Sequence, residues 1–335
     1  MIMKKIIQPI AVTMGDPSGV GVEITLKAWK NNKIKKPFFL IHDYAYVQSI
    51  VKKMKIKVPL KIINEPYQAN KFYKKFLPIY QVDVYKKTQL GKPNKENANA
   101  ILRSIDIALK FVQDGQALAM VTNPIAKDIV NLVSKNFSGH TEYLAKKSKS
   151  KNFCMMLMNT SIKVVPLTIH IPLKKVSHSI SKKLITDTLK IINQSIKIDF
   201  GNKKPKILVT GLNPHAGENG LLGNEEKNII APAINSLKKT MKVYGPISAD
   251  SAFTTENLRE YDAVLCMYHD QALIPIKTID FYNTVNYTAG LKVVRTSPDH
   301  GTGFDIATKF VANENSLVAA IKSAAKIKNN RDSNN

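Results

Sequence analysis

The stretch IAVTMGDPSGVGVE, residues 10–23, decides the fold class. Its first four residues, Ile10–Thr13, are an apolar run that predicts a buried strand, and a glycine-rich loop and a helical pattern follow directly. The same alternation of short apolar runs and helical patterns continues along the chain. We therefore predict an α/β fold with a largely parallel sheet.

The predicted strands are Ile10–Thr13, Phe38–Ile41, Ala117–Val121, Phe153–Met158, Lys163–Ile169, Lys206–Thr210, Asp262–Met267 and Lys292–Val294. The clearest predicted helix follows Pro93, because apolar residues recur at three- and four-residue steps from Ala98 to Val112 and Gly115 suits the stop. Further helices are predicted at Ser181–Lys197, Asn224–Lys239 and Ser316–Lys326. The polar tail, residues 326–335, is expected to be frayed.

The composition is that of an ordinary globular protein. With 335 residues, 44% of them apolar, the chain can bury the core of one large domain or two medium ones. Cys154 and Cys266 lie in apolar runs and are expected to be buried, reduced thiols. Gln8 and Pro9 interrupt the apolar start, and no window reaches the roughly 18 apolar residues that a membrane span needs. We expect a soluble, cytoplasmic protein.

The formal net charge of +25 raises the question of a nucleic-acid partner. Only four of the 50 basic residues are arginine, and the lysines are scattered over most of the length. Proteins that read bases and phosphates favour arginine, and no zinc-finger, helix-turn-helix or RNP-like pattern occurs. Compositional drift explains the charge better, so we expect neither a nucleic-acid nor a membrane partner.

Polar loops follow six of the predicted strands. In open α/β sheets ligands bind outside the carboxyl ends of the strands, so loops in these places predict one composite site. The loops begin at Gly15, Thr122, His170, Gly211, Tyr268 and Arg295.

Three histidines, His170, His215 and His269, lie at predicted strand ends. Three neutral imidazoles can hold Zn²⁺ or a similar ion and leave one coordination position open for substrate. Their spacing has no local signature such as HExxH, and the alternative is three ordinary polar loop residues. The residues alone support the two interpretations about equally.

A fourth histidine, His140, lies in the segment SGHTE where a helix is predicted to begin. The free N–H groups of a helix N-terminus suit a phosphate or carboxylate. The alternative is simple capping by Ser138 or Thr141, with the imidazole merely exposed.

Two other segments offer candidate binding groups. The loop GDPSGVGVE, residues 15–23, differs from GxGxxG and from a P-loop, and is either a ligand-binding loop or only a tight turn. Arg295 suits a fixed anion clamp better than a solvated charge. Lys277, which with Arg295 flanks Asn286, has no local feature that separates it from the other lysines.

Together these motifs resemble the 4-hydroxythreonine-4-phosphate dehydrogenase family of vitamin B6 (pyridoxal phosphate) biosynthesis. The resemblance spans nearly the whole chain. Its most specific pieces, in order, are TMGDPSGVG, VTNPIAK, SGHTEYLA, LTIHIPL, GLNPHAGENG, YHDQALIPIK and VNYTAGLKVVRTSPDHGTGFDIA.

The resemblance implies roles for the candidate residues. His170, His215 and His269 match divalent metal ligands (zinc, magnesium or cobalt), with His269 supplied by the partner subunit of a homodimer whose active site lies at the subunit interface. Lys277 is a candidate proton shuttle. The substrate-binding positions that match are His140, Thr141, Lys277, Asn286 and Arg295.

The implied fold is isocitrate/isopropylmalate dehydrogenase-like, with two α/β/α subdomains and a cleft between them. We expect residues 1–130 and 245–335 to form the subdomain on the cofactor side, and residues 131–244 to form the subdomain for dimerisation and metal binding. NAD or NADP is expected without a Rossmann fingerprint, and no cofactor contact is predicted. Val22 stands where the family usually has Pro, and Ala272 where Gly is commoner, but neither change removes a functional group.

The implied activity is an NAD-dependent, metal-dependent oxidation of 4-phosphooxy-L-threonine to a β-keto acid that decarboxylates to 3-amino-2-oxopropyl phosphate. Three alternatives remain open. They are a dehydrogenase of the same family acting on threonate or erythronate 4-phosphate, a metal-dependent phosphohydrolase and, most remotely, a basic nucleic-acid-binding protein.

Overall fold

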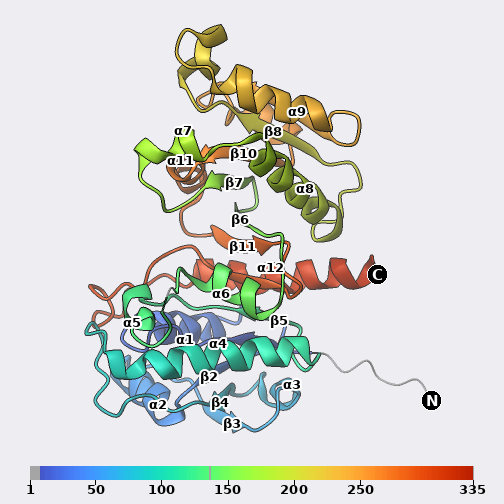
Figure 1. Ribbon diagram of the computed structural model, residues 1–335. Coiled ribbons are helices and arrows are strands. Elements are labelled where there is room, and N and C mark those ends of the chain that lie inside the picture. Colours follow the sequence, from blue (N-terminus) through green and yellow to red (C-terminus); the bar gives the residue numbers. More distant parts are fainter. Residues whose placement is uncertain (1–7, 136, 335) are drawn as a thin grey trace, which may run out of the picture. The chain divides into compact units, whose positions relative to one another are not determined.

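The computed structural model describes residues 8–135 and 137–334. The chain divides into two compact units (Figure 1). The first unit comprises residues 1–149 and 292–328, and the second comprises residues 150–291 and 329–335. Each unit contains strands and helices, which confirms the predicted α/β class.

The first unit is built on a parallel sheet in the order β3-β4-β2-β1-β5-β12. Its strands are β1 (Ile10–Val12), β2 (Phe38–His42), β3 (Leu60–Ile63), β4 (Leu77–Gln81), β5 (Ala119–Val121) and β12 (Arg295–Pro298). Its helices are α1 (Gly21–Lys30), α2 (Tyr44–Lys53), α3 (Gln68–Phe72), η1 (Lys95–Asn97), α4 (Ala98–Gln113), α5 (Lys127–Asn131), α6 (His140–Lys147) and most of α12 (Asn315–Ser333).

The second unit has a mixed sheet in the order β11-β6-β7-β10-β8-β9, in which β7, β10, β8 and β9 run parallel. Its strands are β6 (Cys154–Met158), β7 (Lys163–Thr168), β8 (Lys206–Thr210), β9 (Lys242–Ile247), β10 (Ala263–Tyr268) and β11 (Val285–Ala289). Its helices are η2 (Leu173–Lys175), α7 (Val176–Ser179), α8 (Lys182–Ile198), η3 (Pro214–Gly220), η4 (Glu226–Ile230), α9 (Ala231–Leu237), α10 (Thr255–Glu260) and α11 (His269–Ile279).

Amphipathic helices cover these sheets. The predicted helix after Pro93 is confirmed as α4, which lies against β1, β2 and β5 and buries Ile101, Ile105 and Ala108 (Figure 1). Gly115, with φ +70°, lies just beyond its end. In the second unit α8 packs on β6, β7 and β11 in the same way. These contacts leave the carboxyl ends of the strands to loops.

The units divide the chain at residues other than those predicted. Residues 131–149 belong to the first unit and residues 245–291 to the second. Tyr143 of α6 donates to Asp106 of α4 at 2.8 Å, and β10 pairs with β7 and β8. Each segment therefore joins the unit that holds its partners.

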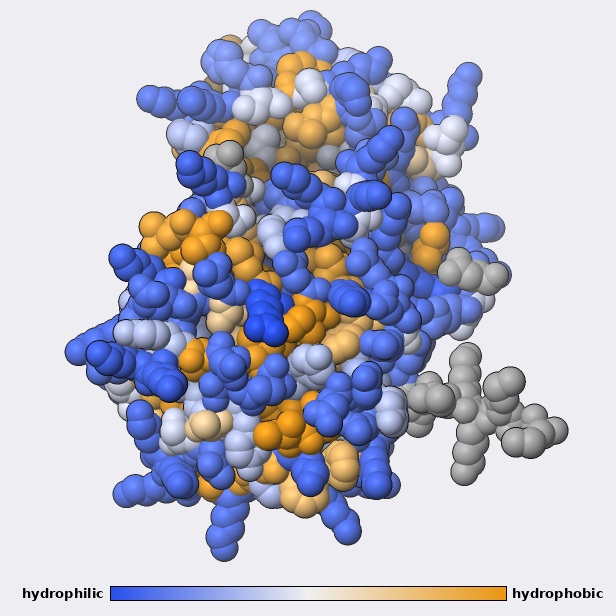
Figure 2. Space-filling model, turned by 60° about the horizontal axis from the view of Figure 1, so that its bottom comes forward, coloured by the Kyte–Doolittle hydropathy of each residue, from blue (hydrophilic) through white to orange (hydrophobic). Residues whose placement is uncertain are grey.

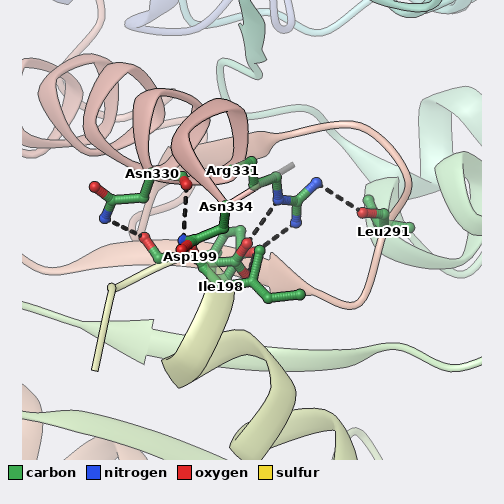
Figure 3. Close-up of polar contacts among 7 residues, drawn as sticks. Ile198, Asp199, Leu291, Asn330, Arg331 and Asn334 are labelled. Atoms are coloured by element: carbon green, nitrogen blue, oxygen red, sulfur yellow. Dashed lines mark hydrogen bonds and ion pairs between the residues drawn. The ribbon is translucent and has the colours of Figure 1, made fainter. Parts of the chain in front are cut away.

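Two predictions of secondary structure are wrong. The last predicted strand, Lys292–Val294, is displaced to Arg295–Pro298, where the backbone pairs with β5. The tail predicted to fray continues α12 to Ser333. Figure 3 shows the reason, because Arg331 donates to the buried Asp199 at 2.6 Å and to the Leu291 carbonyl at 3.0 Å.

Much of the surface is hydrophilic. On the face shown in Figure 2, hydrophilic residues surround several separate apolar patches. Among the described residues, no helix combines the length and the apolar character needed to cross a membrane.

Candidate functional site

The predicted metal ligands follow three neighbouring strands of the second unit. β10 pairs in parallel with β7 on one side and with β8 on the other, so their carboxyl ends lie at the same edge. His170 comes two residues after β7, His269 directly after β10, and His215 in the loop after β8. We call this part of the molecule the histidine edge.

Two of these rings lie close together. The ring centroids of His170 and His269 are 5.8 Å apart, with their planes at 43°. Because Zn–N bonds are about 2.0–2.1 Å long, two imidazoles on one ion have ring centres roughly 5–6 Å apart. The pair therefore fits two ligands of one divalent ion.

His215 is held differently. Its side chain is 70% exposed, and its Nδ1 lies 3.4 Å from Glu218 Oε1. Within residues 8–135 and 137–334, no group of three or more His, Cys, Asp or Glu side chains is arranged to hold a metal ion. The chain thus brings together His170 and His269 but does not add His215 to them. The family resemblance implies that His269 comes from the partner subunit, whereas the structure places the His269 ring beside His170 of the same chain. The contribution of a partner subunit stays a prediction.

The loop that carries His215 is nevertheless firmly anchored. Residues 215–219 all have positive φ, from +40° to +82°, a left-handed turn that non-glycine residues seldom adopt. The buried Glu226 carboxylate accepts hydrogen bonds from the backbone N–H groups of Leu212 (2.7 Å) and Asn213 (2.8 Å). Sequence reasoning missed Glu226, for which the only signal is an acidic residue shortly after a glycine-rich loop.

In the first unit, Arg295 is a buried cation. It is 3% exposed, and its Nε and Nη2 donate to Thr122 Oγ1 at 3.0 and 2.7 Å. Burial lowers the pKa of Arg295 to about 10, while the carboxylates of Glu142 and Asp299 act in the opposite direction. The residue is fixed rather than solvated, as predicted, although it begins strand β12 instead of following a strand.

His140 is the first residue of α6 and lies within electrostatic range of Arg295. Burial lowers the pKa of His140 well below its usual range, and the charges of Arg295 and then Lys127 lower it further. The imidazole is therefore neutral, and its buried Nε2 has no hydrogen-bond partner. The N-cap of α6 is Gly139, which makes no side-chain capping bond. We call His140, Arg295 and Lys127 the Arg295 cluster.

The remaining predicted substrate residues divide between the units. Thr141 follows His140 in α6 of the first unit. Lys277 lies in α11 of the second unit with its Nζ 5.1 Å from the centroid of the Phe281 ring, a cation–π contact. Asn286 lies in β11, opposite Leu157 of β6.

The loop that begins at Gly15 is a tightly packed turn. A Cβ on Gly15 (φ +72°) would lie 2.7 Å from the Asn123 side chain. The Asp16 N–H donates to the Pro124 carbonyl at 2.8 Å, and Asp16 Oδ1 accepts from the Ser18 N–H at 2.9 Å. Burial raises the pKa of Asp16 to about 6, and its Oδ2 has no hydrogen-bond partner. These contacts fit the tight-turn interpretation and leave one unsatisfied carboxyl oxygen.

The two departures from the family pattern lie in packed positions. Val22 is 1% exposed in the first turn of α1, and Ala272 is fully buried in a core cluster of the second unit. Both side chains contribute apolar packing and neither occupies a polar site.

The chain is similar to known proteins over nearly its whole length. Residues 33–324 match the family of the pyridoxal phosphate biosynthetic protein PdxA. The 4-hydroxythreonine-4-phosphate dehydrogenase of Zymomonas mobilis is 40% identical over 329 residues, 97% of each chain. A crystal structure of the enzyme of that name from Klebsiella pneumoniae superposes with a TM-score of 0.85 at 32% identity, covering 96% of this chain and 99% of that one.

A more distant neighbour shows the fold alone. It is a terephthalate 1,2-cis-dihydrodiol dehydrogenase from Burkholderia xenovorans, with a TM-score of 0.62 at 24% identity over 95% of this chain and 98% of that one. The near-complete match to the family, rather than this fold likeness, assigns the protein: the chain belongs to the pyridoxal phosphate biosynthetic protein PdxA family.

Proposed function

We propose that the chain is a 4-hydroxythreonine-4-phosphate dehydrogenase that acts in pyridoxal phosphate biosynthesis. The observation that carries the proposal is the 40% identity, over 97% of both chains, to a relative of that name. The paired imidazoles of His170 and His269 and the buried Arg295 supply the groups that such chemistry needs.

The proposed reaction oxidises the C3 hydroxyl of 4-phosphooxy-L-threonine and yields a β-keto acid, which loses CO₂ to give 3-amino-2-oxopropyl phosphate. When bound, a divalent ion (zinc, magnesium or cobalt) would draw charge from that hydroxyl, and NAD or NADP would accept the hydride. His170, His215 and His269 would hold the ion. The fit of the His170–His269 pair supports two of these assignments.

The other residues act on the substrate directly. Arg295, His140 and Thr141 would hold an anionic end of the substrate, the phosphate or the carboxylate, with charge-assisted and neutral hydrogen bonds. Lys277 would take the proton from the C3 hydroxyl, and Asn286 would orient the substrate. The five positions are the substrate-binding set that the family resemblance implies.

We further propose a homodimer in which the partner subunit completes the histidine edge. Large apolar side chains that follow the three histidines closely in the chain are exposed, with Leu173 at 71%, Leu221 at 79% and Ile274 at 64% exposure. Exposed apolar groups gathered beside a functional site are typical of a protein interface. The free thiols of Cys154 and Cys266 support a cytoplasmic location.

One assay tests the activity. We expect 4-phosphooxy-L-threonine and NAD to give NADH with the phosphate ester intact, and a chelator to stop the reaction. Release of inorganic phosphate without NADH would instead indicate a phosphohydrolase. Faster turnover of threonate or erythronate 4-phosphate would assign a different substrate.

A mixing experiment tests the dimer. His215→Ala and His269→Ala subunits, each inactive alone, should recover part of the activity when mixed if the two histidines of one site come from different subunits. No recovery in a mixture that forms mixed dimers would place all the ligands in one chain.

A further inference from the structure

Gln271 uses both polar atoms of its side-chain amide to bind neighbouring segments. It lies in the first turn of α11, two residues after His269. Its Oε1 accepts hydrogen bonds from the Met267 N–H and from Thr210 Oγ1, both at 2.7 Å. Its Nε2 donates to the Gly211 carbonyl at 2.9 Å. The proposed reaction makes no use of Gln271, so the position of its partners indicates what it does.

These partners belong to two of the three segments that carry the histidines. Met267 lies near the end of β10, and His269 follows that strand directly. Gly211 follows β8 and begins the loop that carries His215. In the described chain, the register between β8 and β10 ends before Met267 and Gly211. The amide of Gln271 therefore joins the two segments where the paired strands no longer do.

Met267 is also the point where the third segment is attached. Thr168 Oγ1 donates to the Met267 carbonyl at 2.8 Å, and Thr168 lies two residues before His170. Met267 is fully buried, and its backbone binds both side chains. Thr168 connects it to the segment of His170, and Gln271 connects it to the loop of His215. The three histidine-bearing segments thus meet at one residue.

Gln271 acts differently from the other anchor of the His215 loop. The Glu226 carboxylate accepts from the backbone N–H groups of Leu212 and Asn213, which fixes the shape of the loop itself. The bonds of Gln271 instead fix the place where the loop leaves β8 relative to β10. Metal sites need ligand distances accurate to about 0.2 Å, so the separation of the two segments matters as much as the shape of either.

We propose that Gln271 is a positioning residue of the histidine edge, which sets the separation between the His215 loop and the end of β10. It thereby controls how tightly the histidines bind a divalent ion. The inference rests on the proposed function for the assignment of the histidines as metal ligands. A neutral amide suits this role, because it offers an acceptor oxygen and a donor nitrogen at once, whereas a methionine of similar length has no donor and only a weak acceptor.

Titration of the metal-free, full-length protein with Co²⁺ tests the proposal. We expect Gln271→Met to weaken Co²⁺ binding about 10-fold, the lower end of the range for residues that position metal ligands. The visible absorption of bound Co²⁺ should change as well, because it depends on the number and arrangement of the ligands. Thr210→Val removes only one of the three bonds, so it should weaken binding by a smaller factor. It carries the same test if Gln271→Met does not fold.

Asn202→Ala is the matched control. Asn202 Nδ2 donates to Asp262 Oδ1 at 2.8 Å, ahead of the beginnings of β8 and β10, so the variant loses a bond at the amino ends of the same two strands. We expect Gln271→Met and Asn202→Ala both to unfold at a lower temperature than the parent protein. Only Asn202→Ala should keep the Co²⁺ affinity and the absorption spectrum of the parent.

The outcomes separate this inference from the proposed function. Equal Co²⁺ affinity and equal spectra of the Gln271→Met and Asn202→Ala proteins would overturn the positioning role, because a merely structural residue lowers stability alone. That result leaves the proposed function intact if the parent forms NADH from 4-phosphooxy-L-threonine. If Co²⁺ binding follows the expected pattern but no NADH is formed, the proposed function fails and the positioning role of Gln271 stands.

Discussion

In the Arg295 cluster of the first unit, hydrogen bonds within the chain hold Arg295 in place. The histidine edge of the second unit, in contrast, brings only two of its three rings together. Arg295 is 3% exposed and hydrogen-bonded to Thr122, while His215 is 70% exposed. A buried cation must have its partners in the fold, or its desolvation would be too costly. A metal site can be left open, because the ion and a second subunit contribute to it. The comparison predicts that anion binding needs one chain and metal binding needs more.

The largest expected effect comes from His215→Ala. Loss of a ligand should remove turnover and metal content together, with activity reduced at least ~100-fold, since even partners of metal ligands account for 10–100-fold. Metal analysis and NADH formation measure the two quantities. His178→Ala, an exposed histidine of α7, is the matched control. A His215→Ala protein that keeps full activity in a chelator would show that the histidine edge holds no catalytic metal.

Arg331→Ala tests whether the second unit, away from the histidine edge, is stabilised by a buried ion pair. Arg331 is paired with Asp199, which is 2% exposed, and its Nη2 donates to the Tyr287 hydroxyl at 2.9 Å. Removing one partner of a buried ion pair costs roughly 3–5 kcal/mol, so urea unfolding should show a loss of that size. Lys326→Ala, an exposed change in the same helix, should cost less than about 0.5 kcal/mol.

Phosphate binding by the Arg331→Ala protein tests whether the two regions are coupled. Arg331 belongs to the second unit and the Arg295 cluster to the first, so the affinity should be unchanged below the unfolding temperature. A parallel loss of phosphate affinity would show that the two regions are coupled.

Asp16→Asn examines a buried carboxyl group of the first unit that is not fully satisfied. The pKa of Asp16 is raised from 3.8 to about 6, so the folded protein binds this proton more tightly than the unfolded chain does. The contribution of Asp16 is therefore most favourable below about pH 4, and it becomes unfavourable as the pH rises through about 6. At pH 7.5 the Asn variant should be more stable by up to ~2–3 kcal/mol, and at pH 4 the difference should vanish.

Urea unfolding of both proteins at the two pH values measures this difference. An Asn variant that is less stable than the parent at pH 7.5 would mean that the carboxylate has a favourable partner.

Sequence patterns predicted a helix or strand correctly where the pattern lies within that one element. The apolar steps of α4 and the buried run of β1 are examples, because each pattern depends on one face of one element. Leu60–Ile63 and Val285–Ala289 are among the strands that were missed, with Leu77–Gln81 and Lys242–Ile247. We compare the first two. The first is largely exposed, with only Ile63 buried, and the second contains Asn286 and Thr288, so neither reads as an apolar run.

In the candidate site, too, local sequence features predicted some residues, and long-range contacts that leave no such feature were missed. The position of Arg295 followed from its rarity and its apolar flank, and the structure buries it as expected. The tail could not be predicted, since Arg331 is ordered by Asp199, which lies more than a hundred residues earlier in the chain. Long-range polar pairs of this kind leave no periodic signal. The same holds for the anchoring of the His215 loop by Glu226.

Gly217→Ala gives the smallest effect and asks whether the histidine edge is shaped before metal binds. Gly217 has φ +82°, and an added Cβ would lie 2.7 Å from Glu226 Oε2. Gly201 has a similar φ, +75°, but its nearest neighbour would be 4.0 Å away, so Gly201→Ala is a control for backbone strain without the clash. Each change should cost roughly 1–2 kcal/mol of unfolding free energy. Only Gly217→Ala should also weaken metal binding several-fold, because the displaced Glu226 carboxylate anchors Leu212 and Asn213 ahead of His215. If calorimetry finds equal metal affinity for the two variants, then the ion or a partner subunit determines the conformation of the loop. The histidine edge would in that case differ from Arg295, which contacts within the chain already hold in place.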